Sequence, residues 1–205
     1  RVTDPIIRST ADTFPPYAKA GDDLTIDQYQ TITFDGSQSF DNGKIENYTW
    51  SLSYNGTNYN LYGMAANFTF EEAGYYDVEL TVTDGGGNSG MDNLSVMVTD
   101  IIPPKAAAGK NESIGQFEII SLNGSGSTDN TGIVNHTWEF SYDGTNHKIY
   151  DMEMSFEFDI PGNYTITLSV RDAVGLLDQD SLQLTVRDLV PPVANYTIDG
   201  KNLAA

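Results

Sequence analysis

The sequence predicts an all-β protein made of tandem Greek-key β-sandwiches, and three observations lead to this prediction. The chain of 205 residues repeats itself at a fixed offset of 88 residues. Several short segments alternate apolar and polar residues, which is the period-two pattern of β-strands. No segment sustains the 3.6-residue period of a helix. A unit of this length exceeds the periods of solenoids and propellers and approaches the size of one sandwich domain.

The repeat also predicts where the domains begin and end. A pair of prolines begins at Pro15 and returns at Pro103 and at Pro191. We expect one sandwich over residues 14–101 and a second over residues 102–189, joined by short proline-stiffened links. Residues 1–13 then represent the end of a preceding module or a linker, and residues 190–205 the first strand of a further module or an assembly strand. The chain is therefore expected to be an excerpt from a longer tandem protein.

The strand pattern is clearest after Gly74, where apolar side chains at Tyr76, Val78, Leu80 and Val82 alternate with polar ones. One period later the inward residues are again apolar, whereas the outward residues have changed from acidic to hydroxyl-bearing and basic. Interior packing explains why one face is retained and the other is free to vary. Further strands are expected at residues 30–34, 46–53, 66–70 and 94–98, each with a counterpart one period later.

Two aromatic positions recur in both repeats and suggest how each core is organised. Trp50 and its counterpart Trp138 fall in the middle of predicted strands, where a large side chain anchors a core. Tyr76 and Tyr164 each follow a glycine by two residues at the start of a long strand. In that position a tyrosine corner can form, with the hydroxyl bonded to nearby backbone.

The composition excludes some classes of function. Twenty-nine acidic residues against ten basic ones give a net charge of -19, which argues against nucleic-acid binding. The chain has no cysteine, so disulfides and thiolate metal sites are excluded. No apolar run approaches the 18 residues that suggest a membrane span, so we expect no membrane contact within this segment.

An excess of N-glycosylation sequons indicates an extracellular protein. Nine of the sixteen asparagines stand in Asn-x-Ser/Thr, against about three expected by chance. Where a sequon lies on a strand, the asparagine alternates with a core aromatic, so it is expected to face solvent. The alternative is that these residue types are simply common in turns and on exposed faces. The candidate sites are Asn47, Asn55, Asn67, Asn93, Asn111, Asn123, Asn135, Asn163 and Asn195.

These anchors together resemble the polycystic kidney disease (PKD) domain. The resemblance rests on residues 34–41, 45–50 and 74–84 of the first repeat and on residues 122–129, Trp138 and residues 162–172 of the second. It implies an immunoglobulin-like sandwich, found in tandem on extracellular proteins, among them archaeal surface-layer proteins and secreted bacterial hydrolases. The family's acidic hairpin after the tryptophan is absent here, which predicts a longer strand before the Asn55-Gly56 turn.

Calcium is the one metal that the sequence suggests. Hard cations prefer several carboxylate and carbonyl oxygens, and five aspartates lie in loops that this fold could gather at one end. The resemblance adds that some family members bind calcium near the equivalent loop. The alternative is that these aspartates only open turns and cap strand ends. The candidates are Asp35, Asp41, Asp84, Asp129 and Asp172.

The chain offers no constellation for catalysis, so we do not expect an enzyme. Its two histidines, His136 and His147, have Tyr48 and Tyr59 as counterparts one period earlier, and a position that accepts either ring is expected to serve packing. No strained nucleophile motif and no histidine cluster accompanies them.

The leading hypothesis is a structural or adhesive cell-envelope glycoprotein segment that works by assembly and spacing, in an archaeal surface layer, a stalk or a filament. Its partners would be neighbouring copies or other envelope proteins, bound by strand addition. The alternative is an accessory module of a secreted hydrolase that contacts polysaccharide or protein through exposed aromatics. The candidates for that surface are Tyr54, Tyr59, Tyr62, Tyr142 and Tyr150.

Overall fold

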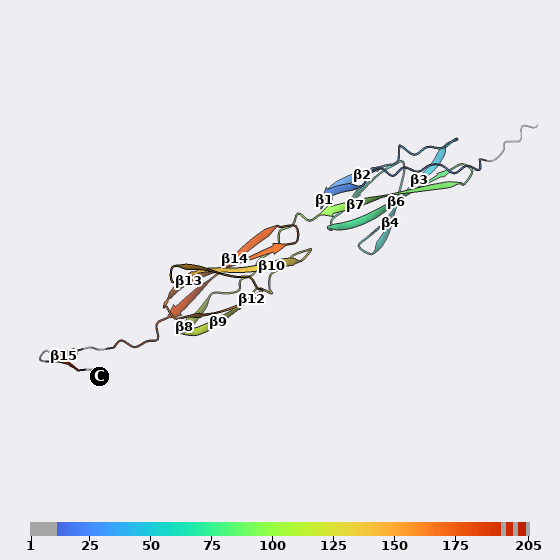
Figure 1. The fold of residues 1–205 in the computed structure, drawn as a ribbon. Helices are drawn as coiled ribbons and strands as arrows, with labels where there is room; N and C mark the ends of the chain where they lie inside the picture. The colour runs from blue at the N-terminus through green and yellow to red at the C-terminus, as the bar shows by residue number, and fades with distance from the viewer. Residues whose placement is uncertain (1–11, 194–195, 199–200, 204–205) are drawn as a thin grey trace, which may run out of the picture. The chain divides into compact units, whose positions relative to one another are not determined.

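The computed structural model describes residues 12–193, 196–198 and 201–203 of the chain (Figure 1). The chain divides into two compact units, Arg1–Ile101 and Ile102–Ala205. All regular structure within the described residues is β, which confirms the predicted fold class of tandem immunoglobulin-like sandwiches. In these same residues, no segment forms a helix long and apolar enough to cross a membrane.

The first unit packs a five-stranded sheet against a two-stranded one. The larger sheet has the order β1-β7-β6-β3-β4, with β1 parallel to β7 and the other pairs antiparallel. The smaller sheet is the antiparallel pair β2-β5. The strands are β1 (Leu24–Asp27), β2 (Thr31–Asp35), β3 (Ile45–Tyr54), β4 (Thr57–Tyr62), β5 (Ala65–Thr69), β6 (Gly74–Asp84) and β7 (Ser89–Thr99).

The second unit repeats this topology one period later. Its larger sheet has the order β11-β10-β13-β14-β8, with β14 and β8 parallel, and its smaller sheet is β12-β9. The strands are β8 (Glu112–Gly115), β9 (Glu118–Asn123), β10 (Ile133–Tyr142), β11 (Thr145–Ile149), β12 (Glu153–Phe158), β13 (Gly162–Asp172) and β14 (Leu177–Arg187). A last pair, β15 (Tyr196–Ile198) and β16 (Lys201–Leu203), is antiparallel.

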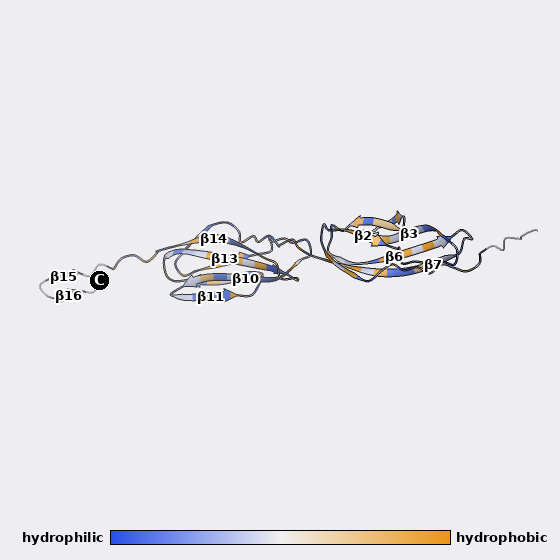
Figure 2. Ribbon diagram, turned by 90° about the horizontal axis from the view of Figure 1, so that it is seen from above, coloured by the Kyte–Doolittle hydropathy of each residue, from blue (hydrophilic) through white to orange (hydrophobic). Residues whose placement is uncertain are grey.

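Each unit has its own hydrophobic core between its two sheets. Trp50 and Trp138 are fully buried, and each indole Nε1 donates a hydrogen bond to a backbone carbonyl, of Gly63 and Met152 respectively. The alternation of hydropathy along the strands is visible in Figure 2. Because one face of each strand enters the core and the other meets water, the inward series that begins at Tyr76 and at Tyr164 is confirmed.

Two local predictions are confirmed in both units. The tyrosine corners form, since the hydroxyl of Tyr76 donates to the carbonyl of Glu72 at 3.0 Å and that of Tyr164 to the carbonyl of Ile160 at 2.7 Å. The strand before the hairpin turn is long, running to Tyr54 in β3. The turn residue Asn55 has a φ of 49° and Gly56 a φ of 70°, the pair of left-handed conformations that a two-residue hairpin loop of this kind requires.

Four strands of the structure, β1, β4, β8 and β11, were not predicted from the sequence. The parallel strands β1 and β8 span four residues each, which is too few for a period to show. The edge strands β4 and β11 are mostly exposed, so they carry little apolar alternation. The C-terminal segment expected as a single strand contains the paired β15 and β16, and Asn195 lies outside the described residues.

Candidate functional site: an aspartate cluster and a sequon-bearing surface

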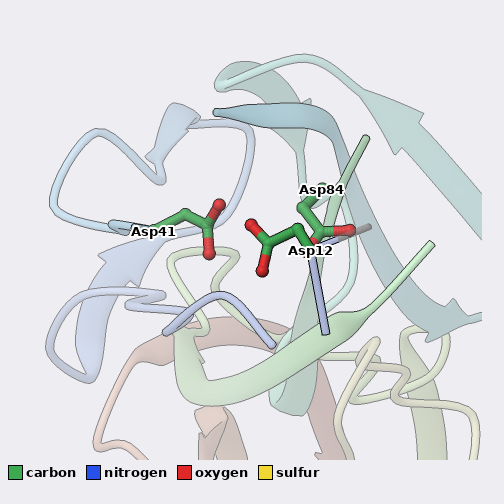
Figure 3. A group of neighbouring side chains, drawn as sticks. All are labelled: Asp12, Asp41 and Asp84. Atoms are coloured by element: carbon green, nitrogen blue, oxygen red, sulfur yellow. The ribbon is translucent and has the colours of Figure 1, made fainter. Parts of the chain in front are cut away.

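Three carboxylates meet at one end of the first unit (Figure 3). Asp12 precedes the first strand, Asp41 lies in the loop between β2 and β3, and Asp84 ends β6. One oxygen from each lies within 4.8 Å of the others. Three acidic groups at this separation repel one another unless a cation or hydrogen-bond donors compensate, so the partners of each oxygen decide what the cluster can do.

The carboxylate of Asp84 is buried, with 4% of the residue exposed, and its neighbours satisfy it. Its Oδ1 accepts hydrogen bonds from the backbone N–H groups of Gly86 and Asn88, each at 2.8 Å. The Nδ2 of Asn88 donates to Oδ2 at 2.8 Å. The amide of Asn88 is the main reason that the pKa of Asp84 lies below its ordinary value, because hydrogen bonds to the charged form favour it.

Asp41 is less completely satisfied. Its Oδ2 accepts the backbone N–H of Gly43 at 3.0 Å, but its Oδ1 is shielded from solvent and has no hydrogen-bond partner. Asp12 is held beside it, because its Oδ1 accepts the backbone N–H of Phe14 at 3.0 Å and the Nδ2 of Asn42 at 3.3 Å. A shielded carboxylate oxygen without a donor is costly, and it is the kind of group that a cation stabilises.

Asp41 and Asp84 have counterparts in the second unit, and one neighbour of the second aspartate differs between the units. Asp129 and Asp172 stand one period after Asp41 and Asp84, with an oxygen of each within 4.8 Å of the other. The Oδ1 of Asp172 accepts the N–H groups of Gly175 and Leu176, but its Oδ2 has no partner although only 1% of the residue is exposed. Leu176 replaces Asn88, so the amide that satisfies the first unit's aspartate is missing.

The expected ligand set needs a correction at Asp35. Its Oδ1 accepts the N–H of Ser37 at 2.9 Å in a turn, and Asn123 does the same for Ser125 in the second unit. Asp35 thus serves its own turn, and the structure does not bring it into the group formed by Asp12, Asp41 and Asp84. Sequence reasoning missed Asp12, which it assigned to a preceding module. The period held the signal, because an aspartate precedes the proline pair at Asp12, Asp100 and Asp188.

His147 packs against core aromatics, as the sequence predicted. The ring of His147 stacks on Phe140 with centroids 5.2 Å apart and planes 8° apart. It takes the place of Tyr59, which packs edge-on against Phe68 in the first unit. His136 is half-buried on β10, two residues before Trp138.

The sequon asparagines lie where a glycan needs them. All eight that the structure describes are exposed: Asn47, Asn55, Asn67, Asn93, Asn111, Asn123, Asn135 and Asn163. They lie on the outer faces of the sheets, at the β3-β4 hairpin turn and in the segment before β8. Attachment of sugars at these positions would leave both cores undisturbed.

The prediction that five tyrosines form an exposed aromatic surface needs a correction, because the structure encloses two of them. Tyr54 is buried, and its hydroxyl accepts the backbone N–H groups of Glu71 and Glu72. Tyr142 is half-buried and packs among the core aromatics, including Tyr164. A ring enclosed in this way cannot stack on a ligand. Of the five candidates, Tyr62 and Tyr150 are the prominently exposed ones, at 74% and 76%, whereas Tyr59 is 37% exposed.

Among curated proteins, the mouse dyslexia-associated protein KIAA0319-like protein is 32% identical over 195 residues, which is 88% of this chain and 19% of that protein. The human dyslexia-associated protein KIAA0319 is 31% identical over 201 residues, which is 90% of this chain and 18% of that protein. The chain therefore spans about a fifth of the length of these relatives.

One matching solved structure is the solution structure of the PKD domain from the KIAA 1837 protein, with 26% sequence identity and a TM-score of 0.38. The match covers 44% of this chain and 92% of that chain. The extracellular cadherin domains 1-4 of protocadherin gamma B7 match with 16% identity, 88% of this chain, 52% of that chain and a TM-score of 0.46. The family model described as PKD domain matches residues 13–98 and 102–186. Since these two matches cover most of the sequence, the chain belongs to the PKD domain family and carries two of its domains in tandem.

Proposed function

We propose that this chain is part of an extracellular glycoprotein in which the PKD domains act by spacing and adhesion rather than by catalysis. The observation that carries the proposal is the exposure of every described sequon asparagine on two sandwiches whose cores are complete within themselves. The placement is what a secreted, glycosylated array needs, because sugars attach at solvent-facing asparagines. The relatives named above are from mouse and human, so an archaeal surface layer stays a prediction.

The partner in this proposal is a neighbouring copy or another surface protein, joined at a sheet edge. Strand β4 is the outer strand of its sheet, and five of its six residues are exposed. It carries no charged residue and no proline, the devices that usually protect an edge strand from pairing. Its free backbone groups could therefore accept a further strand.

Adhesion can be tested with beads coated with the glycosylated chain. We expect coated beads to cluster with each other or with cells that carry the partner. The variant Asn58→Lys, which places a charge on β4, should reduce clustering, whereas Asn146→Lys, at the equivalent position of the edge strand β11 in the second unit, serves as a matched control. Clustering that both variants leave unchanged would remove the strand-addition mechanism. A failure of the unmodified chain to bind any cell or itself would remove adhesion.

A second candidate function is the accessory module that presents polysaccharide or protein to a hydrolase. The exposed rings of Tyr62 and Tyr150 favour it, because solvent-facing aromatics can stack on sugars. A screen of immobilised saccharides separates the two functions. Binding that depends on these tyrosines would favour the accessory module.

We also propose that calcium binds at the aspartate cluster. The donor set fits a hard cation, because oxygens of Asp12, Asp41 and Asp84 converge and the shielded Oδ1 of Asp41 has no other partner. Bound calcium would neutralise these charges and tie three segments of the unit together. Titration calorimetry and thermal melts with calcium, repeated with Asp41→Asn and Asp129→Asn, test this proposal. Melts that calcium leaves unshifted in the unmodified chain would contradict it.

A further inference from the structure

One sequon is retained at the same place in both domains. Asn47 and Asn135 stand one period apart, and no other pair among the nine sequons does. An exposed tyrosine is retained in the same way, because Tyr62 and Tyr150 are also one period apart. Both features lie on outer faces, where the core imposes no residue type. Their joint retention therefore needs an explanation outside the core.

The retained residues are neighbours on one face of the sheet. Thr49, the hydroxyl residue of the first sequon, is the cross-strand partner of Tyr62, and Asn47 lies two residues away along β3 on the same face. Directly opposite partners have side chains about 5 Å apart, and diagonal ones remain within reach of an aromatic ring. A register shift between Ile45 and Asn47, repeated between Ile133 and Asn135, marks the same place in both domains.

In the second domain these residues line a shallow groove of about 440 Å³. Asn135, Thr137 and Tyr150 all border it, together with Glu139, Arg171 and Gln179. Arg171 is the cross-strand partner of Asn135 and uses one nitrogen, Nη1, to donate to the carbonyl of Gly175. A guanidinium has five N–H donors, so others remain for a ligand.

The surrounding face changes freely between the domains, which sets these residues apart. Tyr75 is replaced by Asn163, and Met91 by Gln179, on the same outer surface. The tyrosine beside the sequon is kept although its ring is about three-quarters exposed in both domains. An aromatic ring kept in water beside a glycosylation site is suited to the apolar face of a sugar, which packs on a ring as another apolar group does.

We propose that the first sugar of the glycan on Asn47 packs against Tyr62, and that of the glycan on Asn135 against Tyr150. In the second domain the glycan continues along the groove, where Arg171 and Gln179 offer hydrogen bonds. The inference rests on the proposed glycosylation and names what the glycan contacts. The sugar then covers an exposed ring and stabilises the domain that carries it.

A double-mutant cycle on the full chain, expressed in a host that glycosylates, tests the proposal. Glycopeptide mass spectrometry first establishes occupancy of Asn135. Tyr150→Ser should then lower the melting temperature of the second domain by roughly 4 °C in the glycosylated chain. In the Asn135→Gln background it should have almost no effect. Tyr62→Ser, combined with the same Asn135→Gln change, is the matched control. The effects of these two substitutions on stability should add, because the two sites lie in different domains.

Proton NMR supplies a readout that does not depend on stability. A ring beneath the first sugar shifts its protons upfield, and Tyr150→Ser should abolish this shift. The inference would be overturned if Asn135 is glycosylated but the effects of Tyr150→Ser and Asn135→Gln are independent and no sugar proton is shifted upfield. The proposed glycosylation would then still stand. An unoccupied Asn135 in protein from its native source would overturn both at this site. Tyr150-dependent binding of a free saccharide that an occupied Asn135 does not block would assign the groove to an external ligand instead.

Discussion

The two domains share an interior and differ on the surface. On the outer face of β6 and β7 the cross-strand pairs are Tyr75 with Met97 and Asp77 with Ser95. On β13 and β14 the corresponding pairs are Asn163 with Thr185 and Thr165 with Gln183. The inward residues beside them remain large and apolar in both domains. Packing therefore fixes one face and leaves the other free, so a surface residue that is retained indicates a role other than stability of the core.

The aspartate clusters show the same contrast on a smaller scale. Asp84 and Asp172 occupy equivalent positions and both accept two backbone N–H groups. Asn88 completes the hydrogen bonds of Asp84, whereas Leu176 leaves one oxygen of Asp172 unpartnered. In the first domain, the amide of Asn88 partly compensates the negative charge of Asp84. In the second domain, a cation would have to do this for Asp172. The two sites should differ in affinity for calcium.

The largest effect is expected from Trp138→Ala, which should destabilise the second domain by about 3–5 kcal/mol because it empties the centre of that core. Each domain contains one tryptophan, so the fluorescence of Trp50 reports the first domain alone. Denaturant melts should show Trp50 unfolding at its original midpoint, and Trp50→Ala provides the reciprocal control. A shift of the Trp50 midpoint by a comparable amount would mean that the two cores unfold as one body.

Exchanging residues between the aspartate clusters should have the next largest effect. Leu176→Asn should weaken calcium binding in the second domain by about tenfold, as changes around metal ligands commonly do. Asn88→Leu should have a smaller effect in the first domain, because it frees the Oδ2 of Asp84 but also removes the hydrogen bond from Asn88 to the carbonyl of Asp12. Calorimetry on a chain that also carries Asp129→Asn isolates the first site, and Asp41→Asn isolates the second. Equal affinities at the two sites before the exchange would show that the amide of Asn88 does not compete with the ion.

The tyrosine corner gives a smaller effect with a defined pH dependence. Tyr164→Phe should cost about 1 kcal/mol at neutral pH, because the hydrogen bond to Ile160 is lost. Burial, followed by the negative charges of Asp159 and Asp143, raises the pKa of Tyr164 above its ordinary value. A raised pKa in the folded state means stability that is present below about pH 10 and lost as the pH rises further. The variant should therefore show a shallower alkaline decline, and an unchanged slope would contradict this.

The smallest effect is expected on the outer face. The hydroxyls of Thr167 and Ser181 lie 3.0 Å apart across β13 and β14 and are linked by an exposed hydrogen bond. Thr167→Ala should change the free energy of unfolding by less than about 0.5 kcal/mol, as surface substitutions usually do. A loss of more than 1 kcal/mol, measured by the same denaturant melts, would show that the polar face contributes to the fold.

Features that depend on a local residue pattern could be predicted from the sequence. Features that depend on contacts between segments far apart in the chain could not. The alternation after Gly74 and the repeated tryptophans were sufficient to predict the long strands, both cores and the tyrosine corners. Strand β1 could not be predicted because it is short and pairs in parallel with a strand some 70 residues away in the chain. The aspartate cluster was predicted only in part, because Asp12 joins it through the folded chain rather than through a neighbouring motif.

The same limit applies to the tyrosines proposed as a binding surface. Alternation along β3 places Tyr54 on the inward face with Trp50 and Leu52, although Tyr54 was among the candidates for an exposed aromatic surface. The structure buries the ring because its hydroxyl finds two backbone N–H donors in the loop before β6. Satisfaction of that hydroxyl depends on a loop that no local pattern of β3 predicts.

Glycopeptide mass spectrometry of the protein from its native source tests the central claim most directly. The claim is that these two domains present their outer faces outside the cell and carry sugars there. We predict modified peptides at Asn47 and Asn135, the sequon pair that both domains retain. Unmodified asparagine at both positions and at the other described sequons would contradict it.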